Sequence, residues 1–320
     1  MRIGRSTGVS HPGRKRRRNE DSWVCDPPIF AVADGMGGAK GGEIASRLAA
    51  SALGSAADGS AEERVVALVQ EANRRVYERS AEDASASGMG TTITLALVED
   101  DIVTFGHVGD SRAYLIREET IEQLTDDHSL VAELVRSGKL SPEEAEIHPQ
   151  RSVITRALGT DPDVDVDTFS IESQVGDFFL ICSDGLTSMI DDDVIREVVA
   201  RKRDDLNAAA RALVEKANRS GGEDNITVVC FEIAEESADV PADTAQLPVL
   251  DQNGAGDDED TLSGLESVPT VDTMVVPPAE AQAAAAQPRK RSRWLTLLGV
   301  LLVVLVLLFA AAGLYWALYL

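Results

Sequence analysis

Six short apolar runs within residues 1–235 have the composition of β-strands. They are rich in Val, Ile, Phe and Thr, and turn-forming residues lie between them. The predicted strands cover residues 29–33, 92–98, 102–108, 113–116, 178–182 and 226–233.

Five further segments repeat their apolar residues at the spacing of helices that pack against a core. In one of them Val65, Leu68, Val69, Ala72 and Val76 follow each other at helical intervals, which gives that helix one apolar face. The predicted helices cover residues 43–53, 61–80, 130–137, 192–201 and 206–220.

The order of these elements indicates the fold class. Two helices separate the first strand from the second, and then strands follow one another through short turns. This order predicts an α+β protein with helices packed on antiparallel sheets, in contrast to a strict alternation of βαβ units. Residues 1–235 are long enough to form one such domain.

The C-terminal segment has a different pattern. Residues 294–320 contain no charged side chain and include LLGVLLVVLVLLFAAAGL, which predicts a transmembrane helix and is a weaker match to a buried core helix. Four basic residues directly precede it, so the positive-inside rule puts the preceding domain in the cytoplasm. We therefore expect a single-pass protein of the cell membrane. The basic residues are Arg289, Lys290, Arg291 and Arg293.

Between these two parts lies an acidic stretch. Residues 236–288 carry eleven acids, no Lys or Arg and no aromatic residue. Such a sequence cannot bury enough apolar surface to offset its loss of chain entropy. It predicts a disordered linker over residues 236–293, which ends in the basic juxtamembrane segment.

Charge and cysteine usage exclude several functions. The net charge is −24, and an acidic surface disfavours nucleic acid as a partner because phosphates require clustered Lys and Arg. The three cysteines are far apart and form no CxxC pair, so neither a disulfide framework nor a thiolate zinc site is indicated. An acidic protein is instead suited to binding cations.

The glycine-rich stretch IFAVADGMGGAKGGE (29–43) raises the question of a phosphate-binding loop. Lys40 is followed by Gly41 where a P-loop requires Ser or Thr, and the GxGxxG pattern of dinucleotide loops is also broken by Lys40. For the glycines alone, a flexible turn is the simplest interpretation.

Asp34 in that stretch changes the interpretation, because three other segments resemble it. ADG (33–35), VGDS (108–111), CSDG (182–185) and GEDN (222–225) each place an acid beside an apolar run, and RNEDS adds Glu20 and Asp21. Carboxylates that converge repel each other unless cations lie between them. Oxygen ligands of this kind favour Mg²⁺ or Mn²⁺ over zinc.

Eight segments together resemble one known family. They occur in order over about residues 5–235 and are similar to the metal-dependent Ser/Thr protein phosphatases of the PPM type, the protein phosphatase 2C group, in bacterial form. The segments are RKRRRNEDS, FAVADGMGG, GMGTTIT, VGDSRAYL, LTDDHSLV, VITRALG, ICSDGLTSMI and EDNITVVC.

The resemblance implies a four-layer α-β-β-α sandwich of two antiparallel sheets and a centre for two Mn²⁺ or Mg²⁺ ions. Asp34, the backbone carbonyl of Gly35, Asp184 and Asp224 match the metal ligands of the family. By the same match, Glu20 would act through a metal-bound water, Asp21 would support the centre, Asp110 would bind a third, weaker metal and Arg16 would hold the substrate phosphate.

The implied activity is hydrolysis of phosphoserine and phosphothreonine in proteins by a water that bridges the two metals, opposing a bacterial Ser/Thr kinase. Residues 130–154 match a variable flap, a candidate for substrate selection. Met36 stands where several relatives carry a histidine proposed to protonate the leaving group. Two alternatives stay open: a non-catalytic, membrane-tethered signalling scaffold of the same fold, and an enzyme of the same chemistry that acts on a small phosphorylated metabolite.

Overall fold

The computed structural model describes residues 2–37, 41–54, 58–83, 86–235 and 274–275. Two five-stranded sheets form its centre, and in both sheets all neighbouring strands are antiparallel. The first sheet has the order β1 (Arg2–His11), β13 (Ile226–Ala234), β12 (Phe178–Cys182), β8 (Arg112–Arg117) and β9 (Thr120–Gln123). The second has the order β11 (Asp167–Glu172), β7 (Ile102–Val108), β6 (Ile93–Glu99), β3 (Ile29–Ala33) and β2 (Ser22–Asp26).

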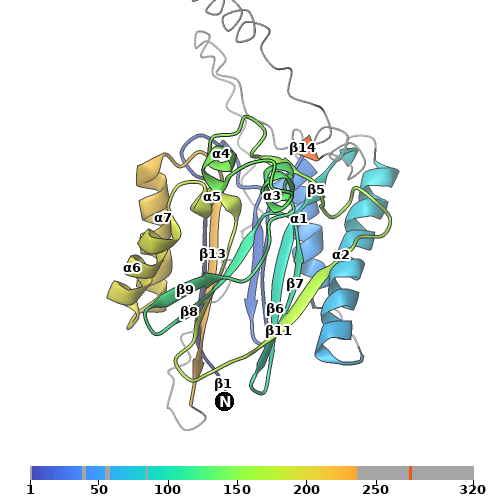
Figure 1. Cartoon of the computed structure of the whole chain (residues 1–320). Helices are drawn as coiled ribbons and strands as arrows, with labels where there is room; N and C mark the ends of the chain where they lie inside the picture. Colours follow the sequence, from blue (N-terminus) through green and yellow to red (C-terminus); the bar gives the residue numbers. More distant parts are fainter. Residues whose placement is uncertain (1, 38–40, 55–57, 84–85, 236–273, 276–320) are drawn as a thin grey trace, which may run out of the picture. The chain divides into compact units, whose positions relative to one another are not determined.

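Helices cover the outer faces of both sheets (Figure 1). α1 (Gly41–Ala52) and α2 (Ala61–Glu82) pack on the second sheet, and α5 (Asp184–Thr187), α6 (Asp192–Lys202) and α7 (Leu206–Ser220) pack on the first. α3 (Leu130–Arg136) and α4 (Pro142–Glu146) lie at one end of the sandwich. The predicted α-β-β-α arrangement of two antiparallel sheets is confirmed.

The central strands are buried on both faces, which explains why they are apolar at successive positions. In β3, Phe30 and Val32 contact the other sheet, while Ala31 and Ala33 contact the helices. Side chains alternate between the two faces of a strand, so a strand between two layers needs apolar residues on both.

Stacked aromatic rings fill the space between the sheets. The ring centroid of Phe231 lies 4.2 Å from that of Phe30 and 5.0 Å from that of Phe179, and both pairs are stacked. All three side chains are fully buried. These rings join β13 and β12 of one sheet to β3 of the other.

The predicted apolar face of α2 is confirmed. Val65, Leu68, Val69, Ala72 and Val76 are all buried against the second sheet. The helix begins with a capping box, in which Ser60 and Glu63 each satisfy a backbone N–H of the other.

Four strands of the sheets were not predicted from the apolar pattern: β1, β2, β9 and β11. They lie at or next to a sheet edge and most of their residues are only half buried, so their sequences carry polar residues throughout. Two short pairs complete the strands: β4 (Gly35–Met36) with β5 (Gly90–Thr91), and β10 (Val153–Ile154) with β14 (Met274–Val275), which falls in the stretch predicted as linker.

The predicted transmembrane helix and nearly all of the predicted linker lie outside the described residues. Among the helices that the structure describes, none has both the length and the apolar character needed to cross a membrane.

Replacing Phe231 tests the inter-sheet core. Phe231→Ala in residues 1–235 should lower the free energy of unfolding by about 3–5 kcal/mol, because a buried ring stacked on two others is lost and a cavity remains. Val175→Ala, at a side chain that is 50% exposed, is the control and should change it by less than about 0.5 kcal/mol. Urea unfolding measures both. Equal effects of the two substitutions would contradict this description of the core.

Candidate active site

The predicted site acids come from the ends of strands in both sheets. Asp34 directly follows β3 and Asp21 directly precedes β2 in the second sheet. Asp184 begins α5 just after β12, and Asp224 lies just before β13 in the first sheet. Because these strand ends meet at one end of the sandwich, acids that are far apart in the sequence come together.

The electrostatics of the acids show that they are neighbours. Burial raises the pKa of Asp34 most, and the charges of Asp21 and Asp184 raise it further. Burial also raises the pKa of Asp184, with further increases from Asp110 and Asp224. Burial is also the main reason why the pKa of Asp21 is raised to about 6 and that of Asp110 to about 7. The structure thus brings five predicted acids into one cluster.

The two carboxylate oxygens of Asp21 differ in their hydrogen bonding among the described residues. Its Oδ2 accepts hydrogen bonds from Ser183 Oγ at 2.9 Å and from Thr227 Oγ1 at 2.6 Å, both in the other sheet's part of the chain. Its Oδ1 is buried and has no hydrogen-bond partner among the described residues. A buried oxygen in this state calls for a cation or a water.

Asn225 organises the chain around the cluster, although no local pattern predicted a role for it. Its side-chain amide donates to the carbonyls of Pro12 and Arg18, and its Oδ1 accepts from the backbone N–H of Glu20. Its own N–H donates to Asp224 Oδ1 at 2.8 Å. This buried side chain therefore connects the basic N-terminal loop to the acid before β13.

Arg16, the predicted phosphate-binding residue, lies beside the cluster. Its Nη2 is 2.8 Å from Asp224 Oδ2, and its side chain is partly buried. Burial alone would lower the pKa of Arg16, but the charges of Asp224 and Asp34 outweigh it and raise the pKa. Of the neighbouring bases, Lys15 is exposed and pairs with Glu223.

Glycines allow the Asp34 loop to pack against Glu20 and the start of α1. A Cβ on Gly35 would lie 2.2 Å from the carbonyl oxygen of Gly42 and 2.4 Å from that of Glu20. A Cβ on Gly42 would lie 2.5 Å from Glu20 Oε2. Any side chain at these positions would push the loop away from Glu20, so close backbone approach explains these glycines. Burial is the main cause of the raised pKa of Glu20.

Gly185 has the same function on the other sheet. A Cβ there would lie 2.0 Å from the backbone oxygen of Asn225. The absence of a side chain lets the turn at Asp184 contact the turn at Asp224.

The cluster suits hard divalent cations. Its donors are carboxylate and carbonyl oxygens, its acids raise each other's pKa, and the buried Oδ1 of Asp21 has no partner among the described residues. No three acidic, His or Cys side chains of the described residues already surround one point as a finished ligand set. The carboxylates would therefore turn toward a cation when they ligate it.

Met36 is buried and packs with Ile154 and Ala157. A thioether carries no acidic proton. The position at which some relatives have a histidine therefore supplies no general acid in this chain.

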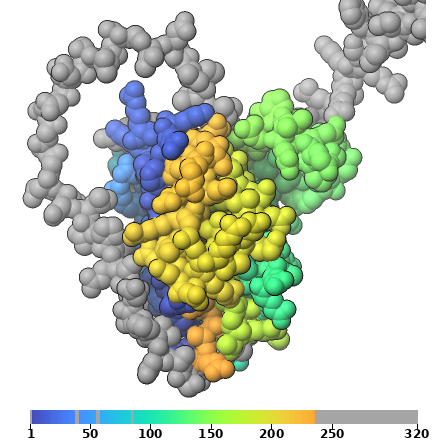
Figure 2. Space-filling model, turned by 90° about the vertical axis from the view of Figure 1, so that its left-hand side faces the viewer, coloured from blue at the N-terminus to red at the C-terminus, as the bar shows by residue number. Residues whose placement is uncertain are grey.

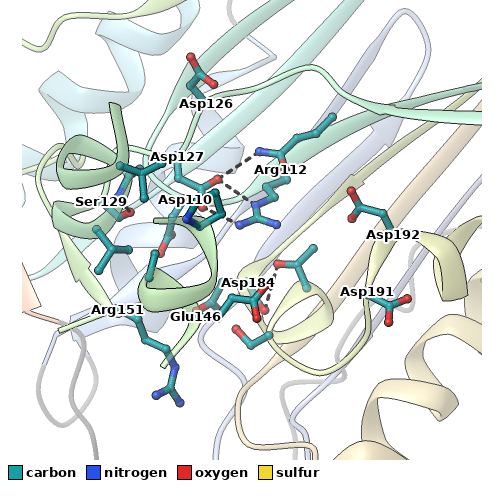
Figure 3. A pocket seen from close by; sticks show the side chains of 18 of the residues that line it. Asp110, Arg112, Asp126, Asp127, Ser129, Glu146, Arg151, Asp184, Asp191 and Asp192 are labelled. Atoms are coloured by element: carbon teal, nitrogen blue, oxygen red, sulfur yellow. Dashed lines mark hydrogen bonds and ion pairs between the residues drawn. The ribbon is translucent and has the colours of Figure 1, made fainter. Parts of the chain in front are cut away.

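A cleft of about 1080 Å³ opens beside the acids. α3 and α4 of the flap line one side of it, and α5 and the start of α6 line the other (Figure 3). Asp110 and Asp184 lie in its wall, so the cleft leads to the acid cluster. Figure 2 shows the flap in light green, projecting from the body of the molecule next to α6 and α7.

Arg112 forms a fixed part of the cleft wall. Its guanidinium donates to both carboxylate oxygens of Asp127, at 2.9 and 2.7 Å (Figure 3). It also donates to the Tyr114 hydroxyl at 3.3 Å. A bidentate pair of this kind holds both side chains in place.

Comparison with known proteins agrees with the geometry. A sequence model described as Protein phosphatase 2C matches residues 7–219. The "Serine/threonine phosphatase stp" of Listeria monocytogenes is 42% identical over 233 residues, which are 69% of this chain and 92% of that protein. The "Serine/threonine protein phosphatase PstP" of Mycobacterium tuberculosis is 35% identical over 308 residues, 93% of this chain and 58% of that protein.

A solved structure is also similar. It is the crystal structure of the catalytic domain of serine threonine protein phosphatase PstP in complex with 2 manganese ions, which has a TM-score of 0.67 and 34% identity and covers 73% of this chain and 99% of its own. The fold, the acid cluster and these matches lead to one conclusion: the chain belongs to the protein phosphatase 2C family of PPM-type Ser/Thr phosphatases.

Proposed function

We propose that this chain hydrolyses phosphoserine and phosphothreonine in proteins with the help of two Mn²⁺ or Mg²⁺ ions. The observation that carries the proposal is the cluster of Asp21, Asp34, Asp184 and Asp224 at one end of the sandwich, beside a cleft of about 1080 Å³. Membership of the protein phosphatase 2C family and similarity to a two-manganese structure support it.

Asp34, the carbonyl of Gly35, Asp184 and Asp224 would hold the two cations. When bound, such ions supply an acidified water as nucleophile and neutralise charge on the phosphoryl oxygens. Asp21 supports the centre through its bonds to Ser183 and Thr227.

Two further acids extend the proposed centre. Glu20, packed against Gly35 and Gly42, would act through water. Asp110, which raises the pKa of Asp184, would contribute to a third cation site.

Arg16 would bind the substrate phosphate. Its guanidinium lies next to Asp224, where a phosphate beside the cations would be within reach. Arginine binds phosphate oxygens through paired, charge-assisted hydrogen bonds. Because Met36 cannot donate a proton, the leaving Ser or Thr oxygen would be protonated by water or by another acid of the cleft.

The retained acids favour catalysis over the scaffold alternative. A scaffold has no need to keep Asp34, Asp184 and Asp224 together against their mutual repulsion. Similarity to proteins named as serine/threonine protein phosphatases favours a protein substrate over a small metabolite.

We further propose that residues 294–320 anchor the enzyme to the cell membrane, with the catalytic domain in the cytoplasm and a Ser/Thr kinase as the opposing enzyme. The uncharged sequence of that segment and the four bases before it support the anchor.

Removing one ligand charge tests the catalytic proposal. Asp184→Asn in residues 1–235 should lower kcat/KM for a phosphothreonine peptide with Mn²⁺ by at least about 100-fold and weaken Mn²⁺ binding in calorimetry. Asp193→Asn, on the cleft wall with a side chain that is 82% exposed, is the matched control and should retain activity within about twofold. Full activity of Asp184→Asn would contradict the assignment, and chelator should abolish wild-type activity.

The raised pKa values predict how stability depends on pH. The folded pKa values of Asp21 (about 6) and Asp110 (about 7) lie above those of an unfolded chain, so the metal-free fold binds extra protons. Its melting temperature should therefore rise as the pH falls from about 8 to about 5.5, and saturating Mn²⁺ should stabilise it most at the higher pH. If calorimetry showed that the melting temperature of the metal-free protein decreases as the pH falls from about 8 to about 5.5, the raised pKa values of Asp21 and Asp110 would be contradicted.

Fractionation tests the membrane anchor. The full chain should remain in the membrane fraction after a carbonate wash, whereas a chain that ends at Pro288 should be recovered in the soluble fraction. Recovery of the washed full chain in the soluble fraction would refute the anchor.

A further inference from the structure

His128 lies buried at the N-terminal end of the flap, and the proposed reaction does not use it. Its side chain is 3% exposed, and its ring centroid lies 4.7 Å from that of His107. The next residue, Ser129, is the N-cap of α3. His128 is therefore a buried residue that directly precedes the N-cap of the first flap helix.

The hydrogen bonds of His128 define where its ring proton lies. The backbone N–H of Gly109 donates to His128 Nδ1 at 3.0 Å, so Nδ1 carries no proton. Burial lowers the pKa of His128, which favours the neutral ring with its proton on Nε2. His128 Nε2 therefore donates to Asp167 Oδ2, which lies 3.0 Å away. Arg156 Nη1 lies 3.1 Å from the same Nε2, but a guanidinium can only donate, so with the proton on Nε2 this pair is a contact and not a hydrogen bond.

Asp167 also binds the other end of the flap. Arg156, just after the flap, donates to Asp167 Oδ1. Asp167 is the first residue of the edge strand β11. One carboxylate on the rigid sheet therefore holds a residue from each end of the flap.

The backbone repeats these connections. The N–H of Thr155 donates to the carbonyl of His128 at 2.8 Å, and Ser129 forms an antiparallel bridge with Ile154. The two ends of the flap are thus joined to each other as well as to Asp167.

His128 also binds both polar groups of Gly109. Its own N–H donates to the Gly109 carbonyl at 2.7 Å, in addition to the bond at Nδ1. Gly109 has a positive φ of 116°, and a Cβ there would lie 2.5 Å from the Thr92 side chain, so the turn is tightly enclosed. The next residue is Asp110, in the wall of the cleft. The position of Asp110 therefore depends on His128.

We propose that His128, Asp167 and Arg156 form a flap-base clamp, in which His128 is a positioning residue that couples the flap to the Asp110 turn. The contact between Nε2 and Asp167 fixes the position of the flap and so governs substrate binding. The contact between Nδ1 and Gly109 fixes the position of the Asp110 turn and so governs turnover. This inference rests on the proposed phosphatase function.

Two substitutions separate the two contacts. In His128→Asn, the amide oxygen can replace Nδ1 and accept from Gly109, but the side chain is too short to reach Asp167. In His128→Gln, the amide nitrogen can replace Nε2 and donate to Asp167, but the acceptor for Gly109 is lost. The full chain is assayed with Mn²⁺ and a phosphothreonine peptide.

His128→Asn should raise KM about tenfold with kcat within about twofold, and His128→Gln should lower kcat about tenfold with KM within about twofold. Asp167→Ala, at a side chain that is 49% exposed, should reproduce the KM effect of His128→Asn. Ser170→Ala, on the same strand, is the control and should change neither constant.

Four results would overturn the clamp. One is unchanged kcat and KM in both His128 variants, and another is the same loss in both. If either variant fails to fold, Asp167→Ala decides, and an unchanged KM in that variant is the third. Nitrogen-15 NMR of the wild-type ring should show an unprotonated Nδ1, and a protonated Nδ1 is the fourth. If the wild-type chain is inactive, the phosphatase function fails, and the NMR result still tests the geometry of the clamp.

Discussion

Mutual repulsion among buried carboxylates is the constraint on which the active site depends. Burial and the neighbouring charges both raise the pKa values of Asp34 and Asp184, so these acids are held close together against their own electrostatics. The apolar layers of the sandwich hold them there, because the strands that end in these acids are buried on both faces. The binding of cations would convert this repulsion into attraction.

Hydrogen bonds between polar side chains at one end of the sandwich join the two sheets around the acid cluster. Asp21 next to β2 bonds to Ser183 after β12 and to Thr227 in β13. Asn225 adds four bonds that connect the basic loop, Glu20 and Asp224. Because buried polar groups are costly when unpaired, these bonds favour one arrangement of the loops. The loops that carry Glu20, Asp21 and Asp224 are therefore held by hydrogen bonds within the protein.

Much of the fold could be predicted from the sequence, because continuous apolar runs and the 3.6-residue period report burial directly. The strands β1 and β11 could not, since edge strands are half exposed and carry sequences such as RIGRSTGVSH and DTFSIE. For the site, the repeated pairing of an acid with a strand end indicated Asp34, Asp184 and Asp224 as candidates, and their roles as metal ligands came from the family resemblance and stay predictions. The functions of Asn225 and His128 depend on contacts between segments far apart in the sequence, and no local pattern indicates them.

The acid cluster is proposed here to be a two-cation centre. Crystals grown with Mn²⁺ and measured at the manganese absorption edge test it most directly, because anomalous scattering locates the ions independently of activity. Two strong peaks are expected in contact with Asp34, the Gly35 carbonyl, Asp184 and Asp224. Peaks elsewhere in the protein, with none at these residues, would contradict it.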